Sequence, residues 1–189
     1  MSKRKQVKLR GVIFEELFSR KEINQKVGDF AQKIMFNYQH SINHPVLLIV
    51  LNGGVYFGVD LSRALDKIGC RHAIDTISLK SYESDENGGA VKIVNYPRLN
   101  LEGRDVIVVE DVIDRGDTLN FLNKYLLGLK EAPHSIQYCT LLMKRNHAPL
   151  EFNLEYLPWT IGSEWIVGYG MDSGQVARGL SSIYVKKES

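Results

Sequence analysis

A run of six aliphatic residues, VLLIVL at positions 46–51, restricts the fold of this 189-residue chain more than any other feature. Pro45 precedes the run and a Gly-Gly pair follows it at residues 53–54, so its length and boundaries favour a strand over a helix. Because the run contains no polar residue, both faces of the strand must be buried, which is typical of a parallel sheet covered by helices. The run therefore predicts an α/β protein.

Segments with the character of helices and strands alternate along the rest of the chain. Apolar residues at three- and four-residue spacing predict helices at 21–42, 55–67 and 119–129. Short apolar or alternating segments predict strands at 73–82, 106–111, 136–144 and 165–170. This alternation implies a central, mainly parallel sheet flanked by helices. We expect one domain over residues 1–189, with its core at about 21–180 and a small hood or flap made from both chain ends.

The basic residues are concentrated at the amino terminus. Lys and Arg number 24 and Asp and Glu 22, a formal net charge of +2, but residues 1–10 hold five basic residues and no acidic one. The rest of the chain therefore has 19 basic and 22 acidic residues, a net charge of −3. A body with this charge offers no broad basic surface to a nucleic acid. We expect residues 1–20 to form a solvated basic arm.

Other features exclude whole classes of protein. Cys70 and Cys139 lie far apart and form no cluster with histidine, which argues against a disulfide framework or a structural zinc site. The longest aliphatic run is too short to cross a membrane, and no apolar segment follows the basic start as it would in a secretory signal. These features predict a cytoplasmic protein that does not bind a membrane.

The stretch VIVVEDVIDRGDTL, residues 106–119, contains the strongest indication of a binding site. A hydrophobic strand runs into an acidic turn, and a helix is expected to follow it. Ligands of open α/β sheets bind at the carboxyl ends of strands. The backbone N–H groups from Asp114 to Thr118 therefore suit a phosphate at the start of the helix, where Gly116 permits a tight turn.

Two adjacent carboxylates, Glu110 and Asp111, precede this turn. The loop has neither the GxxxxGK[ST] pattern of nucleoside triphosphate loops nor the GxGxxG pattern of dinucleotide folds. Adjacent acids at a strand end suit the vicinal hydroxyl groups of a sugar, held directly or through a divalent cation. Because residues 102–117 carry a net charge of −4, bulk attraction does not account for binding of an anion there. The loop therefore predicts a sugar phosphate as ligand, bound with the help of Mg²⁺.

The same stretch resembles the phosphoribosyl-pyrophosphate signature of type I phosphoribosyltransferases, in which two acids precede Asp-x-Gly-x-Thr. Four further blocks resemble the 6-oxopurine members of that family, the hypoxanthine-guanine phosphoribosyltransferases: LNGGVYFGVDL at 51–61, LKSY at 79–82, LLMKR at 141–145 and WIVGYGMDSGQVAR at 165–178. The resemblance implies the type I phosphoribosyltransferase fold. It also implies Mg²⁺-dependent transfer of a phosphoribosyl group from phosphoribosyl pyrophosphate to hypoxanthine or guanine, giving IMP or GMP and pyrophosphate in purine salvage.

The resemblance assigns roles to residues around the donor. Asp114 would act as general base toward N7 of the purine, and Arg178 would contact pyrophosphate. The residues implied in binding phosphoribosyl pyrophosphate are Asn52, Gly53, Ser81, Tyr82, Glu110, Asp111, Asp114, Arg115, Gly116, Asp117, Thr118 and Arg178. The implied Mg²⁺ ligands are Glu110, Asp111 and Asp172.

Two further expectations from the resemblance concern the loops that close around the donor. A cis peptide bond is expected between Asn52 and Gly53, where it would free a backbone N–H group for pyrophosphate. The pair at residues 81–82 and the following SDENGGA loop, with Gly88 and Gly89 as hinges, would close over the site and exclude water.

The purine side of the implied site has four members. Lys144 would donate a hydrogen bond to the 6-oxo group, and this donor rejects adenine, which presents a donor of its own there. Trp165 would stack on the purine face, Ile166 would supply backbone groups to its edge, and Asp172 would lie beside it.

Three positions depart from the commoner pattern of the family. Asn52 stands where Lys or Arg is frequent, which removes a charge near pyrophosphate. Arg115 and Asp117 replace a small hydroxyl residue and a variable residue inside the phosphate loop. Arg115 would offset the carboxylate of Asp117 by pairing with it or with the phosphate, so we expect activity with an altered affinity for the donor.

Three alternatives stay open at this level. The first alternative is an enzyme that prefers xanthine, which differs from hypoxanthine and guanine only at C2. The second is an enzyme that acts on a pyrimidine, although Lys144 and Trp165 argue against it. The third alternative is a non-catalytic regulator that senses phosphoribosyl pyrophosphate or binds RNA, for which the charge of −3 outside residues 1–10 is unfavourable. The resemblance further implies a homodimer or a homotetramer.

Overall fold

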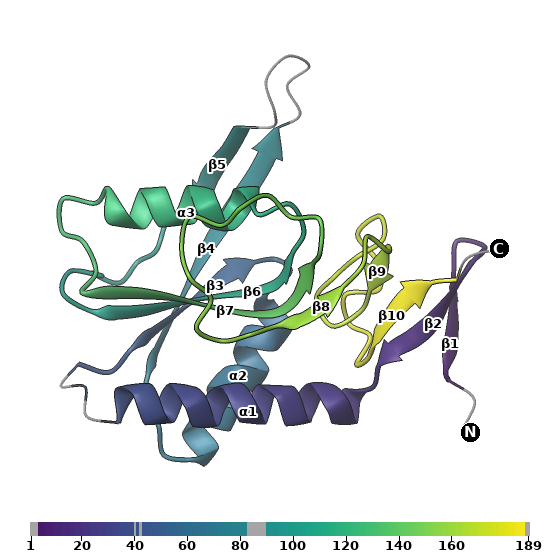
Figure 1. Ribbon diagram of the computed structural model, residues 1–189, viewed down its shortest axis with the longest axis horizontal. Coiled ribbons are helices and arrows are strands. Elements are labelled where there is room, and N and C mark those ends of the chain that lie inside the picture. Colours follow the sequence, from purple (N-terminus) through teal and green to yellow (C-terminus); the bar gives the residue numbers. More distant parts are fainter. Residues whose placement is uncertain (1–3, 40, 42, 83–89, 188–189) are drawn as a thin grey trace.

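The computed structural model describes residues 4–39, 41, 43–82 and 90–187. Its core is a six-stranded sheet in the order β5-β4-β3-β6-β7-β8 (Figure 1). All neighbours are parallel except β4 and β5, which pair antiparallel. The strands are β3 Val46–Leu51, β4 Ala73–Tyr82, β5 Ala90–Asn95, β6 Asp105–Ile113, β7 Ser135–Lys144 and β8 Trp159–Ile161.

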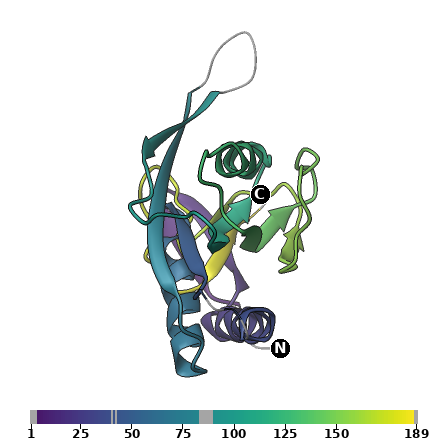
Figure 2. The same cartoon turned by 90° about the vertical axis from the view of Figure 1, so that its left-hand side faces the viewer.

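Helices cover both faces of this sheet, as the uninterrupted aliphatic strands require. The helices are α1 Arg20–Tyr38, α2 Val55–Lys67 and α3 Asp117–Leu127. Leu47 and Ile49 of β3 pack with α1 and α2, whereas Leu48 and Val50 pack with α3 on the opposite face. Figure 2, which looks nearly along α1 and α3, shows the strands between these two helices. The α/β fold with a mainly parallel sheet is therefore confirmed.

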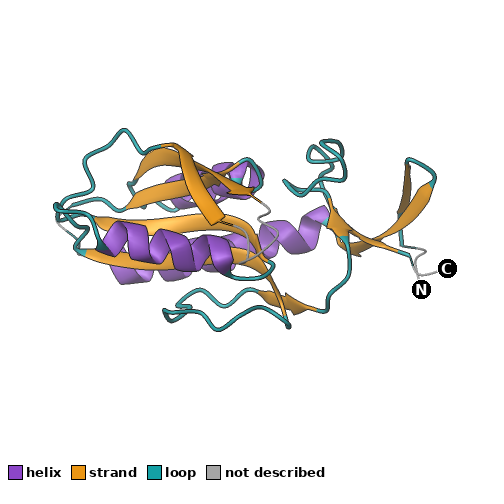
Figure 3. Ribbon diagram, turned by 90° about the horizontal axis from the view of Figure 1, so that it is seen from above, coloured by secondary structure: helices purple, strands orange, loops and turns teal. Residues whose placement is uncertain are grey.

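A second, four-stranded sheet, the hood sheet, lies at one end of the core (Figure 3). Its strands, in the order β1-β2-β10-β9, come from both ends of the chain: β1 Gln6–Leu9, β2 Val12–Phe18, β10 Ile183–Lys186 and β9 Ile166–Val167. All neighbours in it are antiparallel. A flap built from both chain ends was expected, and the hood sheet has this composition.

The expectation of a solvated basic arm is wrong for residues 6–18, because these residues form β1 and β2. Arg10 and Gly11 have φ angles of +48° and +86° and make the two-residue turn between the strands. Strand β2 pairs with β10 at the other end of the chain. A local charge pattern does not reveal a partner that distant in sequence.

The strands predicted at 73–82, 106–111 and 136–144 correspond to β4, β6 and β7, and the predicted helices end or begin within a few residues of α1, α2 and α3. Strands β5, β8 and β10 were not predicted, and β9 is shorter than the expected segment 165–170. The predicted SDENGGA loop spans residues 84–90. Its residues 84–89, which include Gly88 and Gly89, lie outside the described part of the chain. Within the described ranges no helix has the length and apolarity needed to cross a membrane, and both cysteines are free and buried.

Candidate active site

Two adjoining cavities lie at the carboxyl end of β6. The larger, of about 500 Å³, is lined by Asn146 and by residues between positions 110 and 119. The smaller, of about 230 Å³, lies beside Trp165 and Lys144. We call them the loop cavity and the Trp165 cavity. Both are lined by Val112 and Asp114, so the cavities share a wall.

The loop cavity surrounds the turn between β6 and α3. Gly116 has a φ of +90° and is the residue before the first residue of α3, so a side chain at this position would strain the turn. Ala148 donates its N–H to the carbonyl of Arg115 at 2.8 Å, which fixes the turn from the far side. The first N–H groups of α3 have no partner within the helix, and residues 116–119 line the cavity. The cavity is therefore suited to an anion.

The side chains of Arg115 and Asp117 pair across this turn, with 3.1 Å between Nε and Oδ2. Both side chains are largely exposed, at 72% and 50% of their full surface. The expectation that Arg115 offsets the Asp117 carboxylate by pairing with it is thus confirmed in this structure. An exposed pair of this kind is worth little free energy, so an incoming phosphate can readily replace Asp117 as the partner of Arg115.

Glu110 and Asp111 are adjacent in β6 and serve different cavities. Successive side chains of a strand point to opposite sides, and Glu110 lines the loop cavity while Asp111 lines the Trp165 cavity. Burial raises the pKa of the Glu110 carboxyl well above its ordinary value, and the charge of Asp111 raises it further. Within the described part of the chain neither carboxylate forms an ion pair.

Burial also raises the pKa of Asp111 from 3.8 to about 6. Its own backbone N–H, the N–H of Val112 and the charge of Arg178 lower the pKa but do not offset burial, and the charge of Asp172 raises it. Only 7% of the Asp111 surface is exposed. The carboxylate is therefore held ionised at neutral pH at a cost in folding free energy.

Two glycines allow the chain to close on Asp111. A Cβ atom at Gly53 would lie 2.6 Å from Cγ of Asp111, too close for any side chain. A Cβ atom at Gly170 would lie 3.1 Å from the carbonyl carbon of Gly53, and Gly170 has a φ of +108°. The loop after β3 and the loop after β9 therefore meet over the carboxylate.

Asn52, in the loop after β3, is exposed to solvent and lines neither cavity. The expected position of the cis peptide bond is wrong by one residue, because the bond joins Leu51 and Asn52. No proline marks that bond, so the sequence does not locate it.

Lys144 and Asp114 form an ion pair of 2.9 Å between Nζ and Oδ1. The parallel register places Ile113 of β6 opposite Met143 of β7. Asp114, which directly follows β6, and Lys144, the last residue of β7, therefore lie at the same edge of the sheet. The Lys144 side chain is 14% exposed and the Asp114 side chain 61% exposed. The pair thus joins a largely covered cation to a carboxylate that is open to both cavities.

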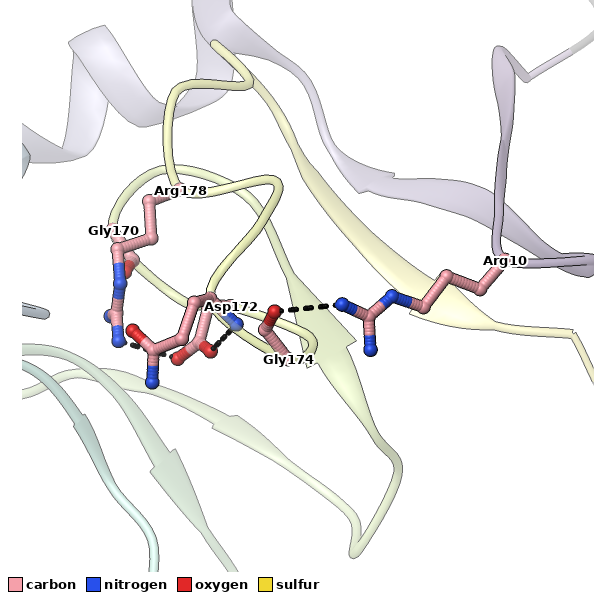
Figure 4. Close-up of polar contacts among 6 residues, drawn as sticks. Arg10, Gly170, Asp172, Gly174 and Arg178 are labelled. Carbon is pink, nitrogen blue, oxygen red and sulfur yellow. Dashed lines mark hydrogen bonds and ion pairs between the residues drawn. The ribbon is translucent and has the colours of Figure 1, made fainter.

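Arg178 and Asp172 form a second ion pair, with 2.6 Å between Nη2 and Oδ1 (Figure 4). Arg178 also donates from Nη1 to the carbonyl of Gly170 at 2.6 Å. Both charged side chains line the Trp165 cavity, which Trp165 borders with 57% of its surface exposed. Ile166 of β9 lines the same cavity and is 7% exposed.

The structure brings most of the residues predicted from the sequence to the two cavities: Glu110, Asp111, Asp114, Arg115, Gly116, Asp117, Thr118, Lys144, Trp165, Ile166, Asp172 and Arg178. Ser81 and Tyr82 form the last residues of β4, and their side chains are not described. The lining residues that sequence reasoning did not assign to the site are Val112, Ile113, Leu119, Asn146 and Met171. Asn146 follows the carboxyl end of β7, a position that indicates a ligand contact in an open α/β sheet.

No group of three or more His, Cys, Asp or Glu residues able to hold a metal ion occurs in the described ranges. The pair of Glu110 and Asp111 nevertheless suits Mg²⁺, which usually binds to one or two carboxylates and takes its remaining ligands from water and substrate phosphates. Adjacent carboxylates that form no ion pair with any described residue also gain from a divalent cation.

Comparisons with known proteins agree with this arrangement. The family model described as phosphoribosyl transferase domain matches residues 14–173. The chain is 28% identical to the hypoxanthine-guanine phosphoribosyltransferase of Aquifex aeolicus over 182 residues, which covers 95% of this chain and 98% of the relative. It is 33% identical to the hypoxanthine phosphoribosyltransferase of Salmonella typhimurium over 167 residues, which covers 88% and 91%.

Solved structures show the same likeness. A crystal structure of a hypoxanthine-guanine phosphoribosyltransferase from Bacillus anthracis has a TM-score of 0.79 and 32% identity, covering 91% of this chain and 97% of that one. The hypoxanthine phosphoribosyltransferase of Trypanosoma cruzi, a mutant in complex with the product IMP, has a TM-score of 0.81 and 28% identity, covering 99% and 92%.

Asp111→Asn should stabilise the metal-free protein at neutral pH. The folded-state pKa of about 6 lies above the ordinary value of 3.8, so ionising Asp111 costs the folded state up to about 3 kcal/mol above pH 6. Urea unfolding in a chelating buffer at pH 7 should give a free energy of unfolding higher by about 1–3 kcal/mol for the variant. The advantage should shrink as pH falls from 6 toward 4, because the wild-type carboxyl then becomes neutral.

The matched control is Asp66→Asn, the same chemical change at an exposed position of α2. It should leave the free energy of unfolding within about 0.5 kcal/mol of wild type. An advantage for Asp111→Asn that stays constant from pH 4 to pH 8 would show that ionisation is not its source.

Proposed function

The chain belongs to the phosphoribosyl transferase domain family, and on that premise we propose that it catalyses the Mg²⁺-dependent transfer of a phosphoribosyl group from phosphoribosyl pyrophosphate to hypoxanthine or guanine. It is a transferase of the hypoxanthine-guanine phosphoribosyltransferase type, and the activity of this type of enzyme belongs to purine salvage. The products would be IMP or GMP and pyrophosphate. The observation that carries the proposal is the common wall of the two cavities at Asp114, which is paired with Lys144.

The loop cavity would take the ribose 5-phosphate part of the donor. The N–H groups at the start of α3 and the hydroxyl group of Thr118 suit the phosphate, and Gly116 allows the close approach. Glu110, which lines the same cavity, would accept hydrogen bonds from the ribose hydroxyls. The surrounding acids repel a free anion, so the backbone donors and a cation must supply the attraction.

Magnesium would be held by Glu110 and Asp111, which form no ion pair with any described residue, together with oxygens of the donor. Asp172 would add an outer contact in exchange for its present pair with Arg178. When bound, Mg²⁺ supplies positive charge that stabilises the departing pyrophosphate. Arg178 would donate to the same leaving group, since its planar guanidinium can bind two oxygens at once.

The Trp165 cavity would take the purine. The exposed indole offers a flat apolar surface for stacking. Lys144 has only donors to offer, so it would bind the 6-oxo group of hypoxanthine or guanine and reject the amino group of adenine. A mismatch between buried polar groups of this kind costs about 10⁴-fold in specificity. Backbone groups of Ile166 would contact the purine edge.

The reaction would then proceed at the common wall of the cavities. The bond between C1 of the ribose and pyrophosphate breaks, and N9 of the purine forms a bond with the same carbon. The N7 proton passes to Asp114 as general base. In the free protein the Lys144 ammonium pairs with the Asp114 carboxylate, so binding of the purine would exchange this pair for a hydrogen bond of Lys144 to O6 and one of N7–H to Asp114.

A direct assay tests the proposed function. The protein is incubated with phosphoribosyl pyrophosphate, Mg²⁺ and each of hypoxanthine, guanine, xanthine, adenine and uracil, and nucleotide formation is followed. We expect product with hypoxanthine or guanine, none with adenine or uracil, and none with any base after chelation of Mg²⁺. Product only with xanthine would support a xanthine enzyme, and no product with any base would leave the non-catalytic regulator. A homodimer or homotetramer remains a prediction, which light scattering on the same sample tests.

Asp114→Asn should lower kcat by about 10²-fold or more, because the amide cannot accept the N7 proton. The KM for phosphoribosyl pyrophosphate should change far less, since the amide oxygen can still pair with Lys144. Steady-state kinetics with hypoxanthine measures both constants, with Asp66→Asn as a variant that should match wild type. An unimpaired kcat would assign the role of general base to another group.

Asp117→Asn should lower the KM for phosphoribosyl pyrophosphate by about two- to fivefold. The change removes a carboxylate that lines the loop cavity and releases Arg115 to bind the phosphate. Glu151→Gln is the matched control, because Glu151 pairs with Lys124 of the same helix but lines neither cavity. Equal KM values for both variants and wild type would mean that the Asp117 carboxylate does not act on the donor.

A further inference from the structure

The loop that carries Asp172 and Arg178 is folded into two tight reversals. Gly168 and Met171 exchange backbone hydrogen bonds across the first, and Ser173 and Val176 exchange them across the second. Six residues within residues 168–177 have φ values of +49° to +108°, in the left-handed region: Gly168, Tyr169, Gly170, Gly174, Gln175 and Ala177. Three of these are not glycine, so the backbone conformation is unfavourable locally and depends on contacts made elsewhere.

The second reversal, residues 173–176, directly holds Asp172. The N–H of Gln175 donates to Oδ2 of Asp172 at 2.7 Å, and the other oxygen of that carboxylate pairs with Arg178. The position of this turn therefore sets the position of both charged side chains in the Trp165 cavity.

A residue from the amino-terminal hairpin contacts this turn. Arg10, in the turn between β1 and β2, donates from Nη2 to the carbonyl of Gly174 at 3.0 Å across 164 residues of sequence (Figure 4). Its guanidinium lies against Gly174, because a Cβ atom there would be 2.8 Å from Cζ of Arg10. The tips of two tight turns, each with positive φ at both central residues, thus meet through one arginine.

We propose that Arg10 is a positioning residue for the transferase reaction: it fixes the turn at residues 173–176 and through it the Asp172–Arg178 pair that would meet pyrophosphate and magnesium. The proposal rests on the proposed function for its effect on catalysis, but the contact itself does not. The hood sheet accordingly contributes to donor binding, although Arg10 lines neither cavity.

Kinetics of Arg10→Ala tests the effect on catalysis. The KM for phosphoribosyl pyrophosphate should rise about three- to tenfold, the effect of losing one exposed hydrogen bond, while kcat stays within about twofold because Arg10 does not contact the reacting atoms. Lys8→Ala is the matched control: it removes the same charge two residues away on an exposed position of β1. In an Asp172→Ala background the further change Arg10→Ala should have no effect on KM. An unchanged KM in Arg10→Ala, or equal effects in both backgrounds, would overturn the proposal.

Hydrogen exchange separates this proposal from the proposed function. The Gln175 N–H should exchange faster in Arg10→Ala than in wild type or Lys8→Ala, since the turn loses its outer contact. If wild-type protein forms no nucleotide, the proposed function fails while this measurement still decides whether Arg10 fixes the turn. Equal exchange in all three proteins would overturn the positioning role.

Discussion

Two adjacent carboxylates near the end of β6, which line different cavities, are the constraint on which the rest of the site depends. Glu110 and Asp111 have raised pKa values because burial disfavours their charge. Neighbouring groups offset only part of this effect of burial on Asp111. Two backbone N–H groups donate to its carboxylate, and the charge of Arg178 lies near it without forming an ion pair. Ionisation of these carboxyls therefore places a poorly balanced negative charge at the point where a sugar phosphate and a cation would bind.

The other charges of the site are balanced within the protein. Lys144 pairs with Asp114, Arg178 with Asp172, and Arg115 with Asp117. Each pair joins a cation suited to one part of the proposed substrates to a nearby carboxylate, so binding would be an exchange of partners and not the capture of a free charge. The pair with Asp114 gives the largely covered Lys144 ammonium a partner within the protein. Electrostatic attraction alone would give little selectivity, and in the proposed reaction the geometry of the exchange would provide it.

The sequence predicts the central part of this structure because the signals there are local. Uninterrupted aliphatic runs mark β3 and β6, and the acids, Gly116 and Thr118 follow β6 in one continuous stretch. The sequence did not predict the strands of the hood sheet, because β2 and β10 pair with each other although they lie near opposite ends of the chain. For the same reason Arg10 was predicted as part of a solvated arm, although its guanidinium lies on Gly174. The ion pair of Asp114 with Lys144 likewise follows from the register of β6 and β7, which no local pattern encodes.

The central claim is that donor and magnesium together relieve the charge of Glu110 and Asp111. Thermal unfolding of wild type and of the double variant Glu110→Gln, Asp111→Asn tests it, with phosphoribosyl pyrophosphate and Mg²⁺ added separately and together. A ligand that binds the folded state at about 100 times its Kd stabilises it by about 2.7 kcal/mol, so Tm of wild type should rise by several degrees with both ligands and little with either alone. The double variant should start from a higher Tm and gain little. An equal rise of Tm in both proteins, or a full rise in wild type without Mg²⁺, would contradict the account.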